Sequence, residues 1–94
     1  MLELDSVIHA PNRLKICAML SAISELDFQL LKAELDVSDS VLSKHIKALE
    51  SAGYLIAEKR KTSGRPTTWL KLTAAGRKAF NEHVAALKSI VGEL

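Results

Sequence analysis

The chain has 94 residues, of which 48% are hydrophobic and 26% charged, so it has room for one globular domain and is too apolar to be a disordered segment. Its single cysteine, Cys17, excludes an internal disulfide and a cysteine-based zinc cluster, and it has neither a secretory leader nor an apolar run of about 18 residues. Residues 37–80 carry nine lysine or arginine residues against three acidic ones, a net +6, whereas residues 1–36 carry a net −3. These features predict a single soluble, cytoplasmic domain over residues 1–94 whose basic centre faces a polyanion, although a merely solvated charged face explains the same excess.

The first 23 residues are expected to form two helices. Leu4 and Ile8 share one helical face, which predicts a short helix over residues 2–9. Pro11 suits the first position of a second helix, where its missing N–H costs nothing, and this helix is expected to end near Ile23. It is apolar on two sides, so it needs a second cover, which a partner chain could supply. That second side consists of Leu14, Cys17 and Ala18.

Two short helices joined by a tight turn are predicted next. Asp27 is a good N-cap for a helix over about residues 28–35. Asp36 can adopt the left-handed conformation that a sharp turn needs, and Ser38 is the N-cap of the following helix. This order predicts a helix-turn-helix over residues 28–52. The inner face of its second helix is Leu42, Ile46 and Leu49.

A β-hairpin is predicted directly after the helix-turn-helix. Gly53 suits the position just past the helix end in a Schellman stop, and residues 54–60 change to the alternating pattern of a strand. A polar, basic loop over residues 62–66 and a second strand over residues 67–72 complete the hairpin. In this position the hairpin is a wing, expected over residues 54–72.

The last predicted element is a helix over residues 74–91 with Thr73 as its N-cap. The whole order predicts a mainly α fold with a small β-hairpin, a winged helix-turn-helix with an added C-terminal helix. An apolar stripe follows one side of this helix, and it consists of Phe80, Val84, Leu87 and Val91.

The outer face of the helix over residues 38–52 is polar. Short hydroxyl side chains lie near its N-terminus and lysines in its middle, which suits entry into a major groove because hydroxyls bond bases or phosphates and lysines meet phosphates or guanine. Asp39 repels phosphate and can instead support the helix N-terminus. An ordinary amphipathic surface helix is the alternative. The outer-face residues are Asp39, Ser40, Ser43, Lys44 and Lys47.

The hairpin tip over residues 58–66 is strongly basic. Gly64 lets the backbone turn, and Arg65 at the apex can enter a narrow minor groove, where the negative potential is greatest. A hairpin edge protected by charge is the alternative interpretation. Trp69 is expected to pack against the hairpin. The cations of this segment are Lys59, Arg60, Lys61 and Arg65.

The chain lacks the residue patterns of catalysis and of metal or nucleotide binding. It has no Gly-x-Ser-x-Gly elbow and no glycine-rich phosphate loop, so an enzyme is the least expected class. His45 flanks the inner stripe of its helix and is expected to be packed or hydrogen-bonded. No metal and no cofactor are predicted. The residues without metal-ligand spacing are His9, Cys17, His45 and His83.

The segment over residues 35–54 resembles the helix-turn-helix of MarR/ArsR-like winged-helix transcriptional regulators, as do residues 72–77 and 8–14. The resemblance implies a homodimer that places two recognition helices in successive major grooves with the wings beside them. The metal-sensing branch carries a cysteine pair in its recognition region, and this chain has none. No effector pocket can be named. The resemblance gives the DNA-contact role to Ser38, Ser40, Ser43, Lys44 and Lys47.

A dimer is also expected from the apolar residues near the two chain ends. One small core cannot cover them all, and pairing about a two-fold axis is the commonest way to bury such a surface. The expected interface, within dimerisation helices over residues 1–23 and 74–91, is Leu4, Ile8, Phe80, Val84, Leu87 and Val91. Two other functions stay open: a winged-helix module that binds protein, and a winged helix that binds RNA.

Overall fold

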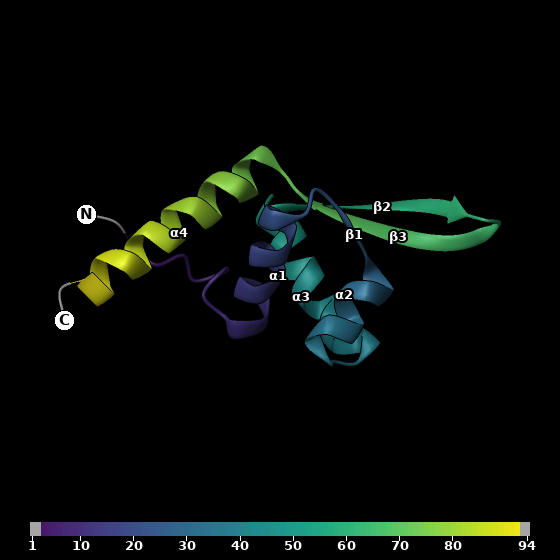
Figure 1. Cartoon of the computed structure of the whole chain (residues 1–94), viewed down its shortest axis with the longest axis horizontal. Coiled ribbons are helices and arrows are strands. Elements are labelled where there is room, and N and C mark those ends of the chain that lie inside the picture. The colour runs from purple at the N-terminus through teal and green to yellow at the C-terminus, as the bar shows by residue number, and fades with distance from the viewer. Residues whose placement is uncertain (1–2, 93–94) are drawn as a thin grey trace.

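The computed structural model describes residues 3–92, which form a winged helix fold 52 × 25 × 21 Å in extent. The wing and the last helix project at opposite ends, and the other helices pack between them (Figure 1). The elements in chain order are α1 Pro11–Ala22, β1 Leu26–Asp27, α2 Phe28–Leu35, α3 Asp39–Ser51, β2 Leu55–Thr62, β3 Arg65–Leu72 and α4 Ala74–Gly92.

The hydrophobic core lies where α1, α2, α3 and the base of the wing meet. Leu42, Ile46 and Leu49 turn the predicted inner face of α3 into this core. Burying one such leucine contributes about 1.5–3 kcal/mol, so the amphipathic stripe alone fixes which face of α3 stays outside. The fully buried members contributed by the other elements are Ile16, Cys17, Leu20, Leu31 and Leu70.

The predicted caps of the helix-turn-helix are confirmed. The Asp27 side chain accepts a hydrogen bond from the backbone N–H of Gln29 at 2.8 Å, and the Ser38 hydroxyl accepts one from the N–H of Val41 at 3.2 Å. Asp36 has the left-handed conformation, with φ 52°. The turn between α2 and α3 is therefore built from local side-chain chemistry.

The end of α3 and the start of α4 meet at Tyr54. The Tyr54 N–H bonds to the Leu49 carbonyl at 3.0 Å and Gly53 has φ 80°, which confirms the Schellman stop. The Thr73 hydroxyl accepts from the Gly76 N–H at 2.9 Å, which confirms the cap of α4. A Cβ on Gly76 would overlap the Tyr54 carbonyl oxygen, so only glycine lets α4 start this close.

The wing belongs to an antiparallel sheet of order β1–β3–β2. Its strands are longer than predicted, because β2 runs to Thr62 and β3 resumes at Arg65. The predicted loop over residues 62–66 is therefore too long, because only residues 63 and 64 lie between the two strands. Ser63 and Gly64 both have positive φ, 53° and 78°, which makes the two-residue turn that favours a continuous hairpin.

The N-terminal segment forms a turn where a helix was expected over residues 2–9, of which residue 2, like residue 1, lies outside the described range. The Asp5 side chain accepts hydrogen bonds from the N–H groups of Val7 at 2.9 Å and Ile8 at 3.1 Å, so a carboxylate caps the turn. Ile8 is fully buried in the core of this chain. The expectation that Ile8 faces a partner is therefore wrong, whereas Leu4 stays 37% exposed.

The second apolar side of α1 is covered within the chain. Cys17 is fully buried and Leu14 packs against the core, while Ala18 stays exposed. The helix α4 contacts α1 and supplies part of this cover, so α1 does not need a partner there. Burial, and then the nearby Asp5, raises the pKa of Cys17 to about 11, which keeps the thiol protonated.

A buried polar network holds the N-terminal turn against α4. His83, which is 1% exposed, accepts the Asp5 N–H at its Nδ1 at 2.9 Å. Its Nε2 lies 3.4 Å from Nδ1 of His9, and the Tyr54 hydroxyl donates to Asp5 at 2.7 Å. Because Nδ1 of His83 accepts a hydrogen bond, this nitrogen is unprotonated, so the ring is neutral and carries its hydrogen on Nε2.

Candidate nucleic-acid interface

The outer face of α3 is open to solvent and carries the predicted hydroxyl and lysine side chains. Ser40, Lys44 and Lys47 are exposed, and Ser43 is half-buried beside them. The Ser38 hydroxyl is engaged as the N-cap and lies 3.2 Å from that of Ser40. The five predicted residues thus form one surface that runs from the N-cap of α3 to Lys47, with Ser38 committed mainly to the helix end.

Val41 is a further exposed residue of α3, at 40%, that the sequence pattern did not single out. It lies between Ser40 and the buried Leu42, outside the apolar stripe of the helix. An apolar residue outside the buried stripe is expected to be exposed, so the sequence could have identified Val41 as a surface residue. An exposed methyl group on a helix of this kind suits apolar contact with the methyl group of thymine.

The one acidic group on the first turn of α3 is paired. Lys32 on α2 places its Nζ 2.8 Å from a carboxylate oxygen of Asp39. Both side chains are partly exposed, so the pair contributes little to stability. It offsets the negative charge that would otherwise face a phosphate beside the helix N-terminus.

A groove of about 490 Å³ separates α3 from the inner face of the wing. Ser43 and Lys47 line it from α3, and Lys59 and Thr68 line it from the two wing strands. Lys59 and Thr68 are register partners, so both side chains stand on the same face of the hairpin. Lys47 and Lys59 thus border the groove from two elements and can bind a sugar-phosphate strand, while Glu50 of α3 also lies in its lining.

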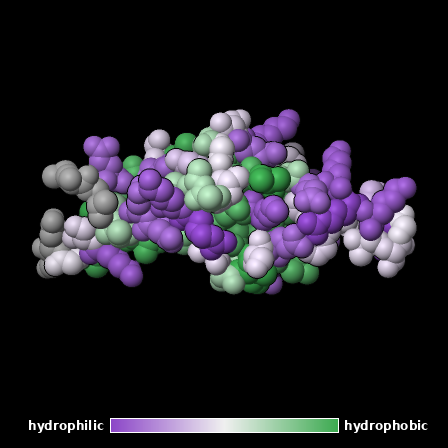
Figure 2. Space-filling view, turned by 90° about the horizontal axis from the view of Figure 1, so that it is seen from above, coloured by the Kyte–Doolittle hydropathy of each residue, from purple (hydrophilic) through white to green (hydrophobic). Residues whose placement is uncertain are grey.

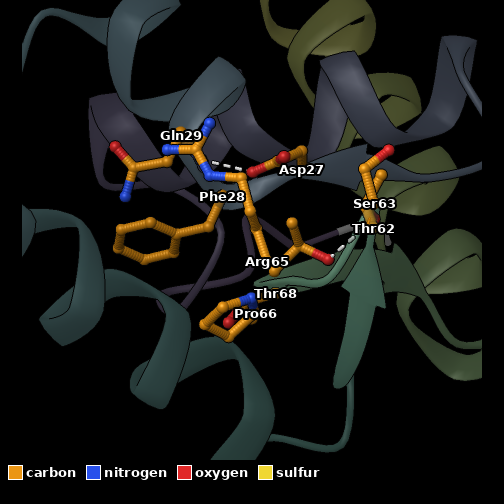
Figure 3. A pocket seen from close by; sticks show the side chains of 9 residues that line it. Asp27, Phe28, Gln29, Thr62, Ser63, Arg65, Pro66 and Thr68 are labelled. Atoms are coloured by element: carbon orange, nitrogen blue, oxygen red, sulfur yellow. Dashed lines mark hydrogen bonds between the residues drawn. The ribbon is translucent and has the colours of Figure 1, made fainter.

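A second groove, of about 540 Å³, lies between the wing tip and the start of α2. The side chains that line it, drawn in Figure 3, include Thr62, Arg65 and Pro66 from the wing and Asp27, Phe28 and Gln29 from β1 and α2. Arg65 and Lys61 are exposed. In Figure 2, hydrophilic side chains run along the wing toward its tip.

The structure places Arg60 differently from its three basic neighbours. Its guanidinium donates to Glu25 at 2.8 and 2.9 Å and to Glu58 at 3.1 Å, and it lies over Trp69, 5.3 Å from the ring centroid. These carboxylates raise the pKa of Arg60, and the Arg60 hydrogen bond lowers the pKa of Glu25. A guanidinium paired this fully is a poor phosphate ligand, so the expectation that Arg60 contacts DNA needs revision.

The apolar stripe of α4 is only partly covered by the chain itself. Phe80, Val84 and Leu87 are half-buried, and Val91 is 65% exposed. The residues that α4 buries fully lie on its neighbouring face and are Gly76, His83 and Ala86. The stripe remains available to a second surface.

The remaining histidine is part of α3 itself. His45 is half-buried, with its Nδ1 3.4 Å from a guanidinium nitrogen of Arg13, in line with a packed and hydrogen-bonded residue. Burial, and then Arg13 and Lys44, lower the pKa of His45. Within residues 3–92, no three His, Cys, Asp or Glu side chains are grouped to hold a metal ion, and no helix there is long and apolar enough to cross a membrane.

The comparisons with known proteins agree with this geometry. The model of the winged helix DNA-binding domain family matches residues 12–91. The Methanocaldococcus jannaschii protein MJ0432 is 36% identical over 78 residues, which are 83% of this chain and 85% of that protein. A solved transcriptional regulator homologue from Pyrococcus horikoshii is 25% identical with a TM-score of 0.87, over 93% of this chain and 86% of that one.

HlyU from Vibrio cholerae is similar as well, with 25% identity and a TM-score of 0.64 over 89% of this chain and 83% of its own. The resemblance to MarR-like winged-helix transcriptional regulators is therefore confirmed. Family membership implies a role in DNA binding. The chain belongs to the winged helix DNA-binding domain family.

Proposed function

We propose that the protein is a transcriptional regulator that binds specific double-stranded DNA sequences as a homodimer. The observation that carries this proposal is the groove between α3 and the wing, because cations border it from both elements. A phosphate strand seated there leaves α3 facing the major groove and the wing tip facing the adjacent minor groove. The proposed contacts are Ser40, Val41, Ser43, Lys44, Lys47, Lys59, Lys61 and Arg65, with Ser38 at the helix end.

The homodimer part of the proposal rests on α4. Its half-covered stripe ends at exposed Val91, and Ile90 beside it is exposed as well. A second copy would cover these residues by two-fold symmetry. Two recognition helices about 34 Å apart then read one face of the duplex, so the preferred site is roughly palindromic. The residues proposed for this contact are Leu4, Phe80, Val84, Leu87 and Val91.

The test is selection of bound sites from a pool of random duplex DNA, followed by titration at several salt concentrations. We expect a palindromic site and an affinity that falls on the order of a thousandfold between about 50 and 200 mM salt, since about six to ten phosphate contacts are available per dimer. Lys44→Ala should change the preferred site and cost about 1–3 kcal/mol on the best sequence. Binding to no duplex, or stronger binding to competing RNA of the same sequence, refutes the proposal.

A further inference from the structure

An ionic cluster on the outer face of the sheet is left unused by the proposed DNA contacts. Arg60 on β2 forms a bidentate ion pair with Glu25, in which two guanidinium nitrogens donate to the two carboxylate oxygens at 2.9 and 2.8 Å. Glu25 directly precedes β1, and the sheet order is β1–β3–β2. The bond therefore links the two edges of the sheet, passing over Trp69 on the central strand.

This cluster sits where the wing leaves the body of the protein. The strand β1 pairs only with Trp69 and Leu70, so the third strand ends there. Beyond that point the wing is a two-stranded hairpin of four residue pairs, from Lys59↔Thr68 to Thr62↔Arg65. A small rotation at the base of this hairpin is amplified at its tip, where Lys61 and Arg65 stand.

We propose that Arg60 and Glu25 are positioning residues that set the angle of the wing relative to α3. They act through Lys59, Lys61 and Arg65, which they hold at the spacing of the phosphate strand, and neither touches DNA. The inference rests on the proposed DNA-binding function. It also assigns a role to Arg60, the one wing cation that forms an ion pair within the part of the chain that the structure describes.

Electrostatics and positioning make opposite predictions for one substitution. Glu25→Gln removes a negative charge from each protomer, and a smaller negative charge should strengthen attraction to a polyanion. If Glu25 instead holds the wing through Arg60, the same change weakens binding because the bidentate pair is lost. Glu34→Gln is the matched control, since Glu34 is an exposed carboxylate on α2 away from the wing.

The binding experiment measures affinity for the selected duplex as a function of salt. We expect Glu25→Gln to bind about two- to fivefold more weakly than wild type, with the salt slope unchanged and Glu34→Gln equal or tighter. Arg60→Ala should also keep the slope, whereas Lys61→Ala should reduce it by about 0.9 for each phosphate that the lysine neutralises in the wild type. Equal or tighter binding by Glu25→Gln, or a slope reduced by Arg60→Ala, overturns the inference.

A second readout needs no DNA. Amide hydrogen exchange of the free protein should become faster in Glu25→Gln for residues 59–68 and stay unchanged in α1 and α3. Unchanged exchange in the wing overturns the positioning role even if DNA binds. If the wild type binds no duplex but Glu25→Gln still speeds amide exchange in the wing, the proposed function is wrong and the positioning role of Arg60 and Glu25 is retained.

Discussion

The wing and α4 project from opposite ends of the molecule and are fixed to its body by different kinds of contact (Figure 1). Beyond its base, which packs into the core, the wing is linked to the body by the ion pairs of Arg60 with Glu25 and Glu58, whose charges remain in contact with solvent. The helix α4 is held by close backbone packing at Gly76 and by neutral hydrogen bonds to buried His83. The end proposed to read DNA can thus be adjusted at small cost, whereas the end proposed to assemble the dimer is rigid.

Gly76→Ala should have the largest effect on stability of the changes proposed here, because it disrupts the packing that holds α4 against the body. The added methyl group meets the backbone of Tyr54, so α4 must move away, and we expect a loss of roughly 3 kcal/mol in the free energy of unfolding. Denaturant unfolding measures this. Gly92→Ala is the control, because nothing lies within 4 Å of its added Cβ. Equal midpoints for both variants would contradict the close packing.

Leu87→Glu should prevent dimerisation through α4 without unfolding the protein. The side chain is half-buried on the open stripe, so a carboxylate there prevents a second copy from docking. Loss of two-site binding should weaken the affinity for a palindromic duplex about a hundredfold. Sedimentation at micromolar concentration should show a monomer. Asn81→Glu, an exposed change on α4, should stay dimeric; a dimeric Leu87→Glu variant rules out this interface.

Lowering the pH should weaken the contacts of α4 with the N-terminal turn before it affects the wing. Burial, and then His9, hold the pKa of His83 below its ordinary value and outweigh the opposing effect of Asp5. Burial alone would raise the pKa of Asp5, but Tyr54 and two backbone amides together lower it, so the carboxylate stays charged. The unfolded chain therefore binds a proton first, and stability falls as the pH drops below about 6.5 and through the depressed pKa of His83.

The expected loss is about 1 kcal/mol, the net value of the Asp5–His83 hydrogen bond, which a protonated ring cannot accept. Denaturant midpoints of wild type and His83→Gln between pH 7.5 and 5 measure it. Among the other groups near the Asp5–His83 contact, His9 lies 3.4 Å from His83, and the raised pKa values of Cys17, about 11, and of Tyr54, about 12, keep both of them protonated in this range. A pH dependence that is the same in His83→Gln argues against the network.

The smallest effect is expected at the wing. Glu25→Gln should leave the thermal midpoint unchanged, because exposed ion pairs contribute little to stability. The same variant is expected to weaken DNA binding, so stability and affinity separate at this end of the molecule. A clear drop in the thermal midpoint would mean that the cluster supports the fold and would remove the contrast with α4.

Local chemistry made much of the fold predictable. Asp27, Asp36, Ser38 and Gly53 act on backbone groups within a few residues, so their roles can be read from the order of residues alone. The outer face of α3 was predictable for the same reason, because its buried stripe repeats with the helical period. The spacing of Leu4 and Ile8 was misleading, since the Asp5 side chain favours a turn that the apolar spacing does not reveal.

The partners of charged and polar side chains could not be predicted. Arg60 pairs with Glu25 across 35 residues, and His83 meets Asp5 across 78. Sequence gives the charge of a wing residue, but the strand register decides which face it occupies and which neighbours reach it. Arg60 was therefore grouped with Lys59 and Lys61, although its neighbours on either side stand on the opposite face of the hairpin.

The two-residue turn at Ser63 and Gly64 also makes the wing sensitive to insertions. Side chains alternate between faces with a period of two, so the turn length decides whether Thr62 and Arg65 stay directly opposite each other. Buried Leu55 on β2 and Leu70 on β3 fix the faces of both strands at the base of the wing. One residue added between Thr62 and Arg65 would therefore have to bulge out at the tip and would displace Lys61 and Arg65, while Lys59 and Arg60 keep their faces.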